Sequence, residues 1–310
     1  MYLDHFGLNS LPFQITPDTD FLFLNARMQE SINVVLVALT TGEVFVKVTG
    51  EVGTGKTLLC RQLLATLDRM EFVTCYILNP LMGPLDAYKA FADELGLTPH
   101  VDAEGLQSFI KRINDHLLEL HRQEKKVVLF VDEAQSLSDA TLEAIRLMTN
   151  LETKKQKILQ VVLLGQSELD VRLNTQHNLR QLRQRISFST VIQPLSIQET
   201  ERYIQHRLQV AGGLGRDLIS RRACRRIFHY SRGIPRLTNV LSHKALLAAF
   251  GLGARQVLPS HVEMAARDTD SIGVGKRWSI MKLLDHLPWR FRGLLLMLAV
   301  VRLFGGDAPP

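Results

Sequence analysis

Residues 50–57, Gly-Glu-Val-Gly-Thr-Gly-Lys-Thr, constrain the fold of this chain more than any other segment. They fill every defining position of the phosphate-binding loop Gly-x-x-x-x-Gly-Lys-Thr, which joins a strand to a helix. Residues 44–49 before the loop are rich in β-branched side chains, and residues 58–68 after it carry leucines at helical spacing. The sequence therefore predicts a strand, a loop whose backbone amides face phosphate oxygens, and a helix that begins near Gly55.

The chemistry of such a loop gives its residues distinct roles. Glycines let the backbone curl closely around an anion, Lys56 places an ammonium near the β- and γ-phosphates, and Thr57 offers a hydroxyl to Mg²⁺. We therefore expect a bound nucleotide with Mg²⁺. The residues predicted to bind the nucleotide in this loop are Gly50, Glu51, Val52, Gly53, Thr54, Gly55, Lys56, Thr57 and Leu58.

Apolar strand-like runs alternate with helical patterns from residue 44 to 192, and after Pro194 only helical patterns follow. Nearly all-apolar strands that alternate with helices are typical of a parallel sheet covered on both faces. The predicted fold class is α/β, a P-loop parallel sheet sandwiched by helices and followed by a smaller all-α lid. The predicted parts are an extended segment, a nucleotide-binding α/β domain, a helical lid and a tail, over residues 1–25, 26–194, 195–270 and 271–310.

Two places in the predicted lid fit a capping box, in which a serine begins a helix and a glutamate three residues later bonds back to it. They are Ser196 with Glu199 and Ser260 with Glu263. Each pair is predicted to begin a lid helix.

Acidic and amide side chains follow two of the predicted strands. The apolar run 127–131 ends in Asp132 and Glu133, and we expect it to pair beside the strand of the phosphate loop. Asp132 is the candidate for holding Mg²⁺ through its water shell, and Glu133 is the candidate base for the attacking water. The next apolar run ends at Gln166, whose amide would then lie beside the carboxylates. A solvated acidic turn and an ordinary loop amide are the alternative interpretations.

Arginines gather in two further places. The segment Arg180-Gln-Leu-Arg-Gln-Arg185 precedes the last predicted strand, from where a guanidinium can reach the γ-phosphate of a neighbouring subunit. We prefer Arg185 to Arg183 for this role because it is closer to the strand, and a salt-bridged helix face is the alternative. In the lid, Gly233-Ile-Pro-Arg236 begins a helix, and Arg236 is predicted to point back over the nucleotide.

Composition adds weaker constraints. A net charge of +6 and an isoelectric point near 9.3 permit attraction to nucleic acid or anionic lipid without indicating either. The three cysteines lack C-x-x-C spacing, so we expect packed, reduced thiols instead of disulfides or a zinc site. The first residues lack a basic region followed by an apolar stretch, which predicts no cleaved secretion signal and a cytoplasmic location.

The tail contains both tryptophans, Trp278 and Trp289, beside the apolar stretch 294–301. This stretch is far shorter than the about 20 residues that a membrane-spanning helix needs. It fits an interfacial anchor, with peripheral membrane contact through 276–304, or a helix packed on the lid or on a neighbouring subunit.

Together these motifs resemble the AAA+ ATPases over about residues 26–270. The opening Tyr2-Leu-Asp-His-Phe-Gly-Leu, the loop, Asp132-Glu-Ala-Gln and Leu164-Gly-Gln-Ser-Glu-Leu are more narrowly similar to the ExeA family of secretion ATPases. Within that family the similarity is to members associated with biogenesis of the MSHA type IV pilus.

This resemblance implies ATP and Mg²⁺ as cofactors and hydrolysis of ATP at the inner membrane. Lys56, Glu133, Gln166 and Arg236 would act within one subunit, and Arg185 or Arg183 on the next subunit of a ring-like homo-oligomer. The implied partners are pilus or secretion assembly proteins.

Two alternatives stay open. One is a DNA-associated AAA+ ATPase of the transposition or replication-helper type, which the basic run Arg221-Arg-Ala-Cys-Arg-Arg226 permits. The other is a nucleotide-locked scaffold with negligible turnover, against which the presence of Glu133 argues.

Overall fold

A computed structural model describes residues 2–14, 19–70, 72–78, 82–98, 105–150, 157–213 and 217–269. The tail with Trp278 and Trp289 lies outside these residues, so the membrane contact expected through 276–304 stays a prediction. Within the described residues, no helix is both long enough and apolar enough to cross a bilayer.

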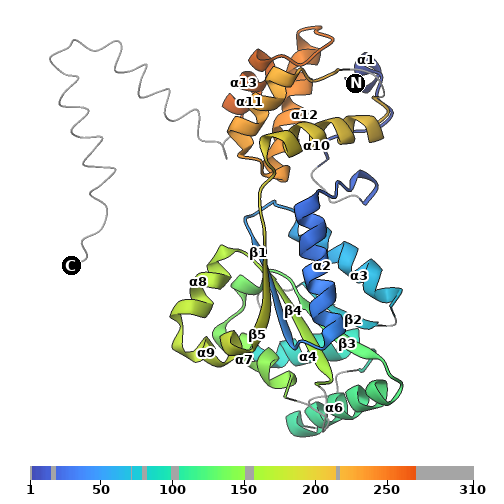
Figure 1. The fold of residues 1–310 in the computed structure, drawn as a ribbon, viewed down its shortest axis with the longest axis vertical. Coiled ribbons are helices and arrows are strands. Elements are labelled where there is room, and N and C mark those ends of the chain that lie inside the picture. The colour runs from blue at the N-terminus through green and yellow to red at the C-terminus, as the bar shows by residue number, and fades with distance from the viewer. Residues whose placement is uncertain are drawn as a thin grey trace, which may run out of the picture.

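A parallel sheet forms the centre of the lower part of the molecule, with strand order β2-β3-β4-β1-β5 (Figure 1). Its central strands are buried on both faces, and every residue of β4 is buried. The predicted fold class, a P-loop parallel sheet sandwiched by helices and followed by an all-α lid, is confirmed. The strands are β1 (Phe45–Gly50), β2 (Phe72–Ile77), β3 (Lys126–Val131), β4 (Leu159–Gly165) and β5 (Ile186–Ile192).

The order of the strands corrects one prediction. β4 pairs with both β1 and β3, so the strand that ends at Asp132 does not lie beside the strand of the phosphate loop. Successive strands are neighbours only about two thirds of the time, and apolar pattern alone does not fix their order. As a result Gln166, which follows β4, lies between the loop and the two carboxylates.

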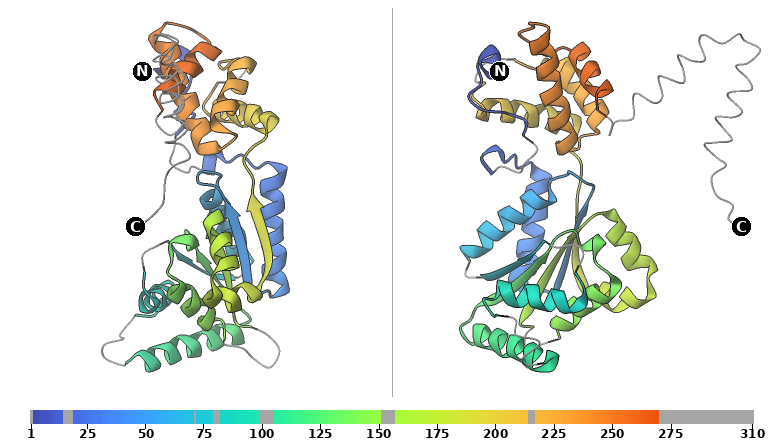
Figure 2. Two further views of the ribbon diagram at one scale, coloured as in Figure 1. Left: turned by 90° about the vertical axis from the view of Figure 1, so that its left-hand side faces the viewer. Right: turned by 180° about the vertical axis from the view of Figure 1, so that it is seen from behind.

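Helices cover both faces of the sheet (Figure 2). Along β3, Val128 and Phe130 point to one face of the sheet, called the first face here. Val127, Leu129 and Val131 point to the second face. This alternation is the strand period of two. The first face is covered by α2 (Ala26–Thr41) and α3 (Lys56–Asp68), and the second by α4 (Pro84–Glu94), α6 (Leu106–Arg122), α7 (Asp139–Met148), α8 (Ser167–Thr175) and α9 (Arg180–Arg185).

The lid has its own apolar core above the sheet. Its helices are α10 (Ile197–Val210), α11 (Arg221–Ser231), α12 (Pro235–Gly251) and α13 (Pro259–Arg267). The capping box of Ser196 and Glu199 is confirmed at the start of α10. The one predicted at Ser260 and Glu263 is wrong, because Pro259 already stands in the first helical turn and His261 caps the backbone of Leu258.

The N-terminal segment packs on the lid. Its first residues form a short helix, α1 (Tyr2–Phe6), where the sequence predicts an extended segment. Tyr2 and Phe6 are four residues apart, which brings both rings to one face, and that face is buried in the lid core. A second short helix, η1 (Thr19–Phe21), precedes α2.

All three cysteines are free and buried, as the sequence predicts. Burial raises the pKa of Cys75 and of Cys224 to about 12, which keeps both thiols protonated and unreactive.

Candidate nucleotide-binding and hydrolytic site

The phosphate loop connects the end of β1 to the start of α3. Gly55 caps α3 in a left-handed conformation and supplies no side-chain hydrogen bond to the first turn. The first amides of a helix need acceptors, and the helix dipole favours an anion there. The loop therefore presents unfilled backbone donors where a phosphate would bind.

Lys56 is buried at the centre of this loop, with 6% of its surface exposed. Its Nζ donates hydrogen bonds to the carbonyl oxygens of Gly50 and Glu51, at 2.9 and 3.0 Å. Burial lowers the pKa of Lys56, and the negative charges of Glu133, Asp132 and Glu168 oppose this effect. A buried ammonium held only by carbonyls fits the polyphosphate that the sequence predicts.

Asp132 and Glu133 follow β3 and face different partners. Asp132 is buried, and its Oδ2 accepts a hydrogen bond from the Tyr76 hydroxyl at 2.9 Å while its Oδ1 accepts the amide of Glu133. Burial and then Asp132 raise the pKa of Tyr76 above its usual range, so the phenol stays a donor. Glu133 has a φ of 51°, a backbone conformation that is costly for a residue with a side chain and that occurs often at functional sites.

The carboxylate of Glu133 is held by two amides. Its Oε2 accepts hydrogen bonds from Nε2 of Gln166, at 3.1 Å, and from Nε2 of Gln135. Gln166 therefore lies beside the carboxylates as predicted. Gln135 is a contact that sequence reasoning missed, although it stands within the Asp132-Glu-Ala-Gln motif.

The lid touches the phosphate loop through Arg236. Its backbone amide donates to the carbonyl of Gly53 at 3.2 Å, and its exposed guanidinium has no hydrogen bond or ion pair with another described residue. A Cβ on Gly53 would lie 2.6 Å from the Cβ of Arg236. The loop needs glycine there because the lid comes so close, as well as for phosphate binding.

One cavity of about 510 Å³ joins these residues. Its volume lies within the range of small-molecule sites in proteins. Of the residues predicted from the sequence, it is lined by Val52, Gly53, Thr54, Gly55, Lys56, Thr57, Leu58, Glu133 and Arg236.

The other end of the cavity is aromatic, and sequence reasoning missed it. Phe23 meets Tyr203 edge to face with ring centroids 5.7 Å apart, and Arg207 lies 4.9 Å over the ring of Phe21. The Tyr203 hydroxyl donates to Asn239. Tyr203 and Arg207 stand four residues apart in α10, but only the fold shows that the N-terminal aromatics meet them.

The arginines before β5 lie away from this cavity. The phosphate loop lies at the carboxyl ends of the parallel strands, whereas Arg183 and Arg185 precede β5 and so lie at the amino ends. β5 has seven residues, so about 20 Å separates these arginines from their own phosphate loop. Arg185 donates to Thr149 within its own chain, at 3.1 Å, whereas Arg183 is exposed and donates a longer hydrogen bond, 3.5 Å, to Oδ1 of Asn174.

The donors present fit Mg²⁺ bound together with a nucleotide. Mg²⁺ usually takes one or two protein oxygens, with phosphates and waters as its other ligands. Thr57 lines the cavity, and Asp132 directly follows β3 and precedes Glu133, which also lines the cavity. Among the described residues, no cluster of three histidine, cysteine or acidic side chains could hold a metal without a nucleotide.

Comparisons with known proteins agree with this geometry. Residues 40–173 match the family described as AAA domain. The chain is 41% identical over 278 residues to General secretion pathway protein A of Aeromonas hydrophila. The aligned region covers 90% of this chain and 50% of that protein. The chain therefore spans about half the length of this curated relative.

Two solved structures share the fold at low sequence identity. Drosophila ORC bound to DNA has a TM-score of 0.64 and 17% identity, over 96% of this chain and 78% of that chain. The Aeropyrum pernix ORC2 protein, solved as ADPNP and ADP complexes, has a TM-score of 0.58 and 16% identity, over 81% and 71%. The chain thus has the fold of the P-loop AAA+ proteins, matches the AAA domain family over residues 40–173, and is similar in sequence to General secretion pathway protein A, as expected from its resemblance to the ExeA family.

Proposed function

We propose that this chain hydrolyses ATP and that hydrolysis depends on self-association. The observation that carries the proposal is the convergence of Lys56, Glu133 and Arg236 on one cavity from the loop, the end of β3 and the lid. Two cations and a carboxylate base around an anion site meet the needs of in-line displacement on a γ-phosphate.

Each residue has a role in this proposal. Lys56 neutralises the β- and γ-phosphates, Glu133 accepts the proton of the attacking water, and Gln166 holds the Glu133 carboxylate. Arg236 places positive charge over the phosphates from the lid. When bound, Mg²⁺ would supply a Lewis acid at the phosphates, with Thr57 and Asp132 as its protein partners.

Self-association is supported by the position of the arginines at the amino ends of the strands, from where they cannot reach their own site at the carboxyl ends. Arg185 donates a 3.1 Å hydrogen bond to Thr149, whereas the exposed Arg183 donates a longer one, 3.5 Å, to Asn174. Arg183 is therefore the better candidate for entering a neighbouring site. A second cavity, of about 660 Å³, presents Glu51 and Glu168 beside Arg236, and these acidic residues would attract an incoming arginine.

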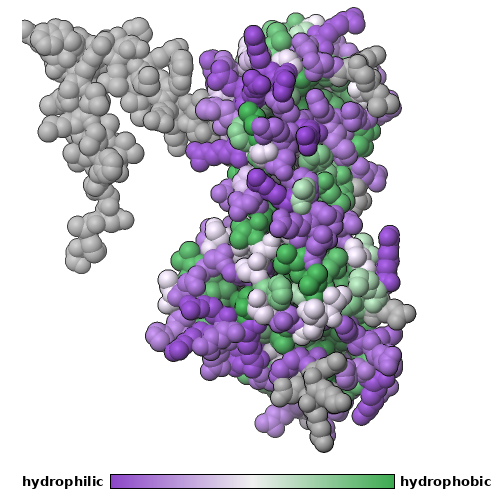
Figure 3. Space-filling view, viewed as in Figure 1, coloured by the Kyte–Doolittle hydropathy of each residue, from purple (hydrophilic) through white to green (hydrophobic). Residues whose placement is uncertain are grey.

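An apolar face also supports association. Val34, Val37 and Phe188 line an open hollow between α2 and β5, Val37 is 52% exposed, and Figure 3 shows hydrophobic side chains over these elements. Exposed apolar patches often mark protein contacts.

We further propose that ATP use assists assembly of a secretion machine, or an MSHA-like type IV pilus, at the cytoplasmic side of the inner membrane. The identity to General secretion pathway protein A supports the secretion role. The resemblance to MshM, the ExeA-family member associated with biogenesis of the MSHA type IV pilus, supports the pilus. Contact with pilus or secretion assembly proteins, and with the membrane through 276–304, belongs to this proposal.

A DNA-associated ATPase is the second candidate. Its support is the exposed arginine face of α11 and the fold shared with Drosophila ORC, which was solved bound to DNA. Part of this arginine charge is already neutralised, because Arg221 and Arg225 pair with Glu201 and Arg226 pairs with Glu263.

The deciding measurement is the steady-state ATPase rate per subunit against protein concentration, alone, with anionic liposomes and with duplex DNA. A rate that climbs with concentration and again with liposomes supports the membrane-associated oligomeric ATPase. Stimulation by DNA alone supports the second candidate. A wild-type rate no higher than that of Lys56→Ala contradicts hydrolysis by this site.

A further inference from the structure

Gln135 connects the ends of β3 and β4 at the candidate base. Its Nε2 donates to Oε2 of Glu133, and its Oε1 accepts the backbone amide of Gln166 at 2.9 Å. The side chain of Gln166 donates to the same Oε2 of Glu133. Three residues from two strand ends thus form a closed set of hydrogen bonds around one carboxylate oxygen.

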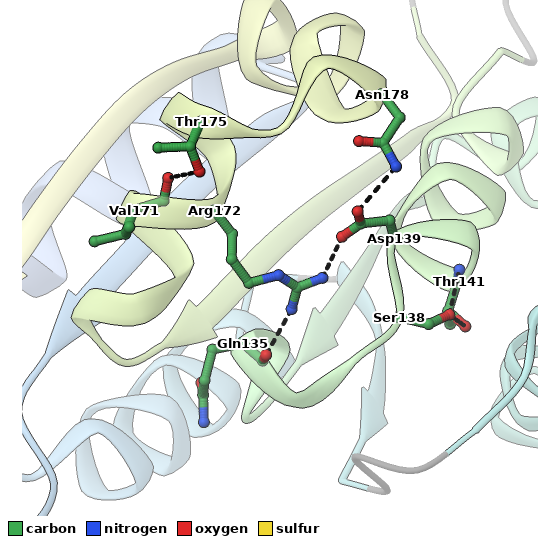
Figure 4. Close-up of polar contacts among 8 residues, drawn as sticks. All are labelled: Gln135, Ser138, Asp139, Thr141, Val171, Arg172, Thr175 and Asn178. Atoms are coloured by element: carbon green, nitrogen blue, oxygen red, sulfur yellow. Dashed lines mark hydrogen bonds and ion pairs between the residues drawn. The ribbon is translucent and has the colours of Figure 1, made fainter. Parts of the chain in front are cut away.

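Arg172 of α8 holds Gln135 from behind. Its Nη1 donates to the backbone carbonyl of Gln135 at 2.6 Å, and its Nη2 pairs with Oδ1 of Asp139 at the start of α7 (Figure 4). Oδ2 of Asp139 accepts a further hydrogen bond from Asn178 at 2.8 Å. Gln135 is therefore fixed on its backbone by a charged group that is itself fixed by a carboxylate.

This arrangement leaves one oxygen of Glu133 for chemistry. Both amides occupy Oε2, while Oε1 has no hydrogen bond with another described residue, and Glu133 lines the cavity. A base must lie within hydrogen-bond reach of the proton that it accepts, and small misplacements of such a group are costly in rate. Two donors on one oxygen fix the direction of the other.

We propose that Gln135 is a positioning residue for Glu133 and that Arg172 positions Gln135. This inference rests on the proposed function, in which Glu133 is the base. Gln135 acts through the carboxylate of Glu133 and Arg172 acts through Gln135, so neither needs to touch ATP or water.

The test measures kcat and, separately, the affinity and stoichiometry of ATP binding for Gln135→Ala, Arg172→Met and the double variant. Gln107→Ala and Arg122→Met on α6 are matched controls, because Gln107 is exposed and Arg122 is an exposed, ion-paired arginine. Gln135→Ala is expected to lower kcat about tenfold or more, with the ATP dissociation constant within about twofold of wild type.

The double variant tests the route. If Arg172 acts through Gln135, the double variant keeps the kcat of Gln135→Ala within about twofold, because residues that act as one unit are not additive. Multiplicative losses would contradict that route. Gln135→Glu is expected to be at least as slow as Gln135→Ala, since a second negative charge would repel the carboxylate.

Three results would overturn the inference. They are a kcat of Gln135→Ala within about twofold of the controls, a loss of kcat that follows a loss of binding stoichiometry, and a Gln135→Glu variant as fast as wild type. Glu133→Gln, measured in parallel, separates this inference from the proposal beneath it. If Glu133→Gln hydrolyses ATP at the wild-type rate, the base assignment fails and the positioning role falls with it; if Glu133→Gln is inactive and Gln135→Ala is not, only the positioning role fails.

Discussion

At the scale of single residues, Gly53 meets two requirements at once. Its φ of +80° is a conformation that favours glycine, and its Cα lies against Arg236 of the lid. The first requirement belongs to the loop, whereas the second belongs to the contact between loop and lid. A substitution can separate them.

Gly53→Ala is expected to weaken ATP binding by about tenfold, because the added methyl group would push Arg236 and the lid away from the loop. Gly42→Ala is the matched control, since Gly42 has a φ of +89° and nothing within 4 Å of a Cβ. Both variants should lose about 1 kcal/mol of unfolding free energy from backbone strain. Calorimetric ATP titrations that give equal affinities for the two variants would contradict a lid contact through Gly53.

The ion pair behind Gln135 should show in the response to acid. A hydrogen bond from Arg172 lowers the pKa of Asp139. Because the folded pKa lies below the unfolded value of about 3.9, the stabilisation is present above that value and is lost as the pH falls through the folded pKa. Urea unfolding at pH 7, 4 and 3 should therefore show the difference between wild type and Asp139→Asn shrinking as the pH falls. A difference that stays constant would contradict this assignment.

At the scale of helices and strands, the start of a helix can be tested in two places that look alike in sequence. Ser196→Ala should lower the unfolding free energy by about 1 kcal/mol, because Ser196 caps α10. Ser260→Ala is the control and should have little effect, because Ser260 lies exposed inside the first turn of α13. Equal losses in denaturant unfolding would mean that the capping assignment of α10 or of α13 is wrong.

These two serines also show how far the sequence predicts the elements. The strands before the phosphate loop and before Asp132 were predictable because their apolar runs are strong, and the predicted ranges 44–49 and 127–131 agree with β1 and β3 within one residue. The prediction that Ser260 caps a helix was wrong because the capping-box pattern takes no account of Pro259, which already begins the helix. The pairing of β3 with β4 could not be predicted from the sequence, because the order of strands in a sheet depends on how the connections between them cross over.

The candidate site divides in the same way. Lys56, Glu133, Gln166 and Arg236 were predictable because each stands in a local motif at the end of a strand or the start of a helix. The aromatic end of the cavity was not, since Phe23 and Tyr203 are 180 positions apart and meet only when the N-terminal segment folds onto the lid.

At the scale of the whole molecule, the phosphate loop lies at the carboxyl ends of the strands and the arginine cluster lies at their amino ends. In the proposed function, a second copy brings the amino ends of its strands, with their arginines, to the phosphate loop of the first. The separation of about 20 Å makes an intrachain contact impossible without unfolding β5.

Mixing two inactive variants tests this shared site. Lys56→Ala subunits keep their arginines, and Arg183→Ala subunits keep an intact loop, so some mixed contacts pair a good loop with a good arginine. ATPase activity should reappear at intermediate ratios, and the same series with Arg185→Ala identifies which arginine acts. No activity at any ratio with either variant would contradict action between subunits through these arginines.

The N-terminal segment gives the lid a second covalent tie. Residues 2–13 pack in the lid, the chain enters the sheet layer at α2, and it leaves again between Ile192 and Leu195. Asn25 and Gln193 line the same cavity, so both crossings flank the candidate nucleotide site. A lid joined to the sheet domain by one polypeptide segment could rotate about any axis. A lid joined by two segments is restricted to rotation about the axis that passes through both of them.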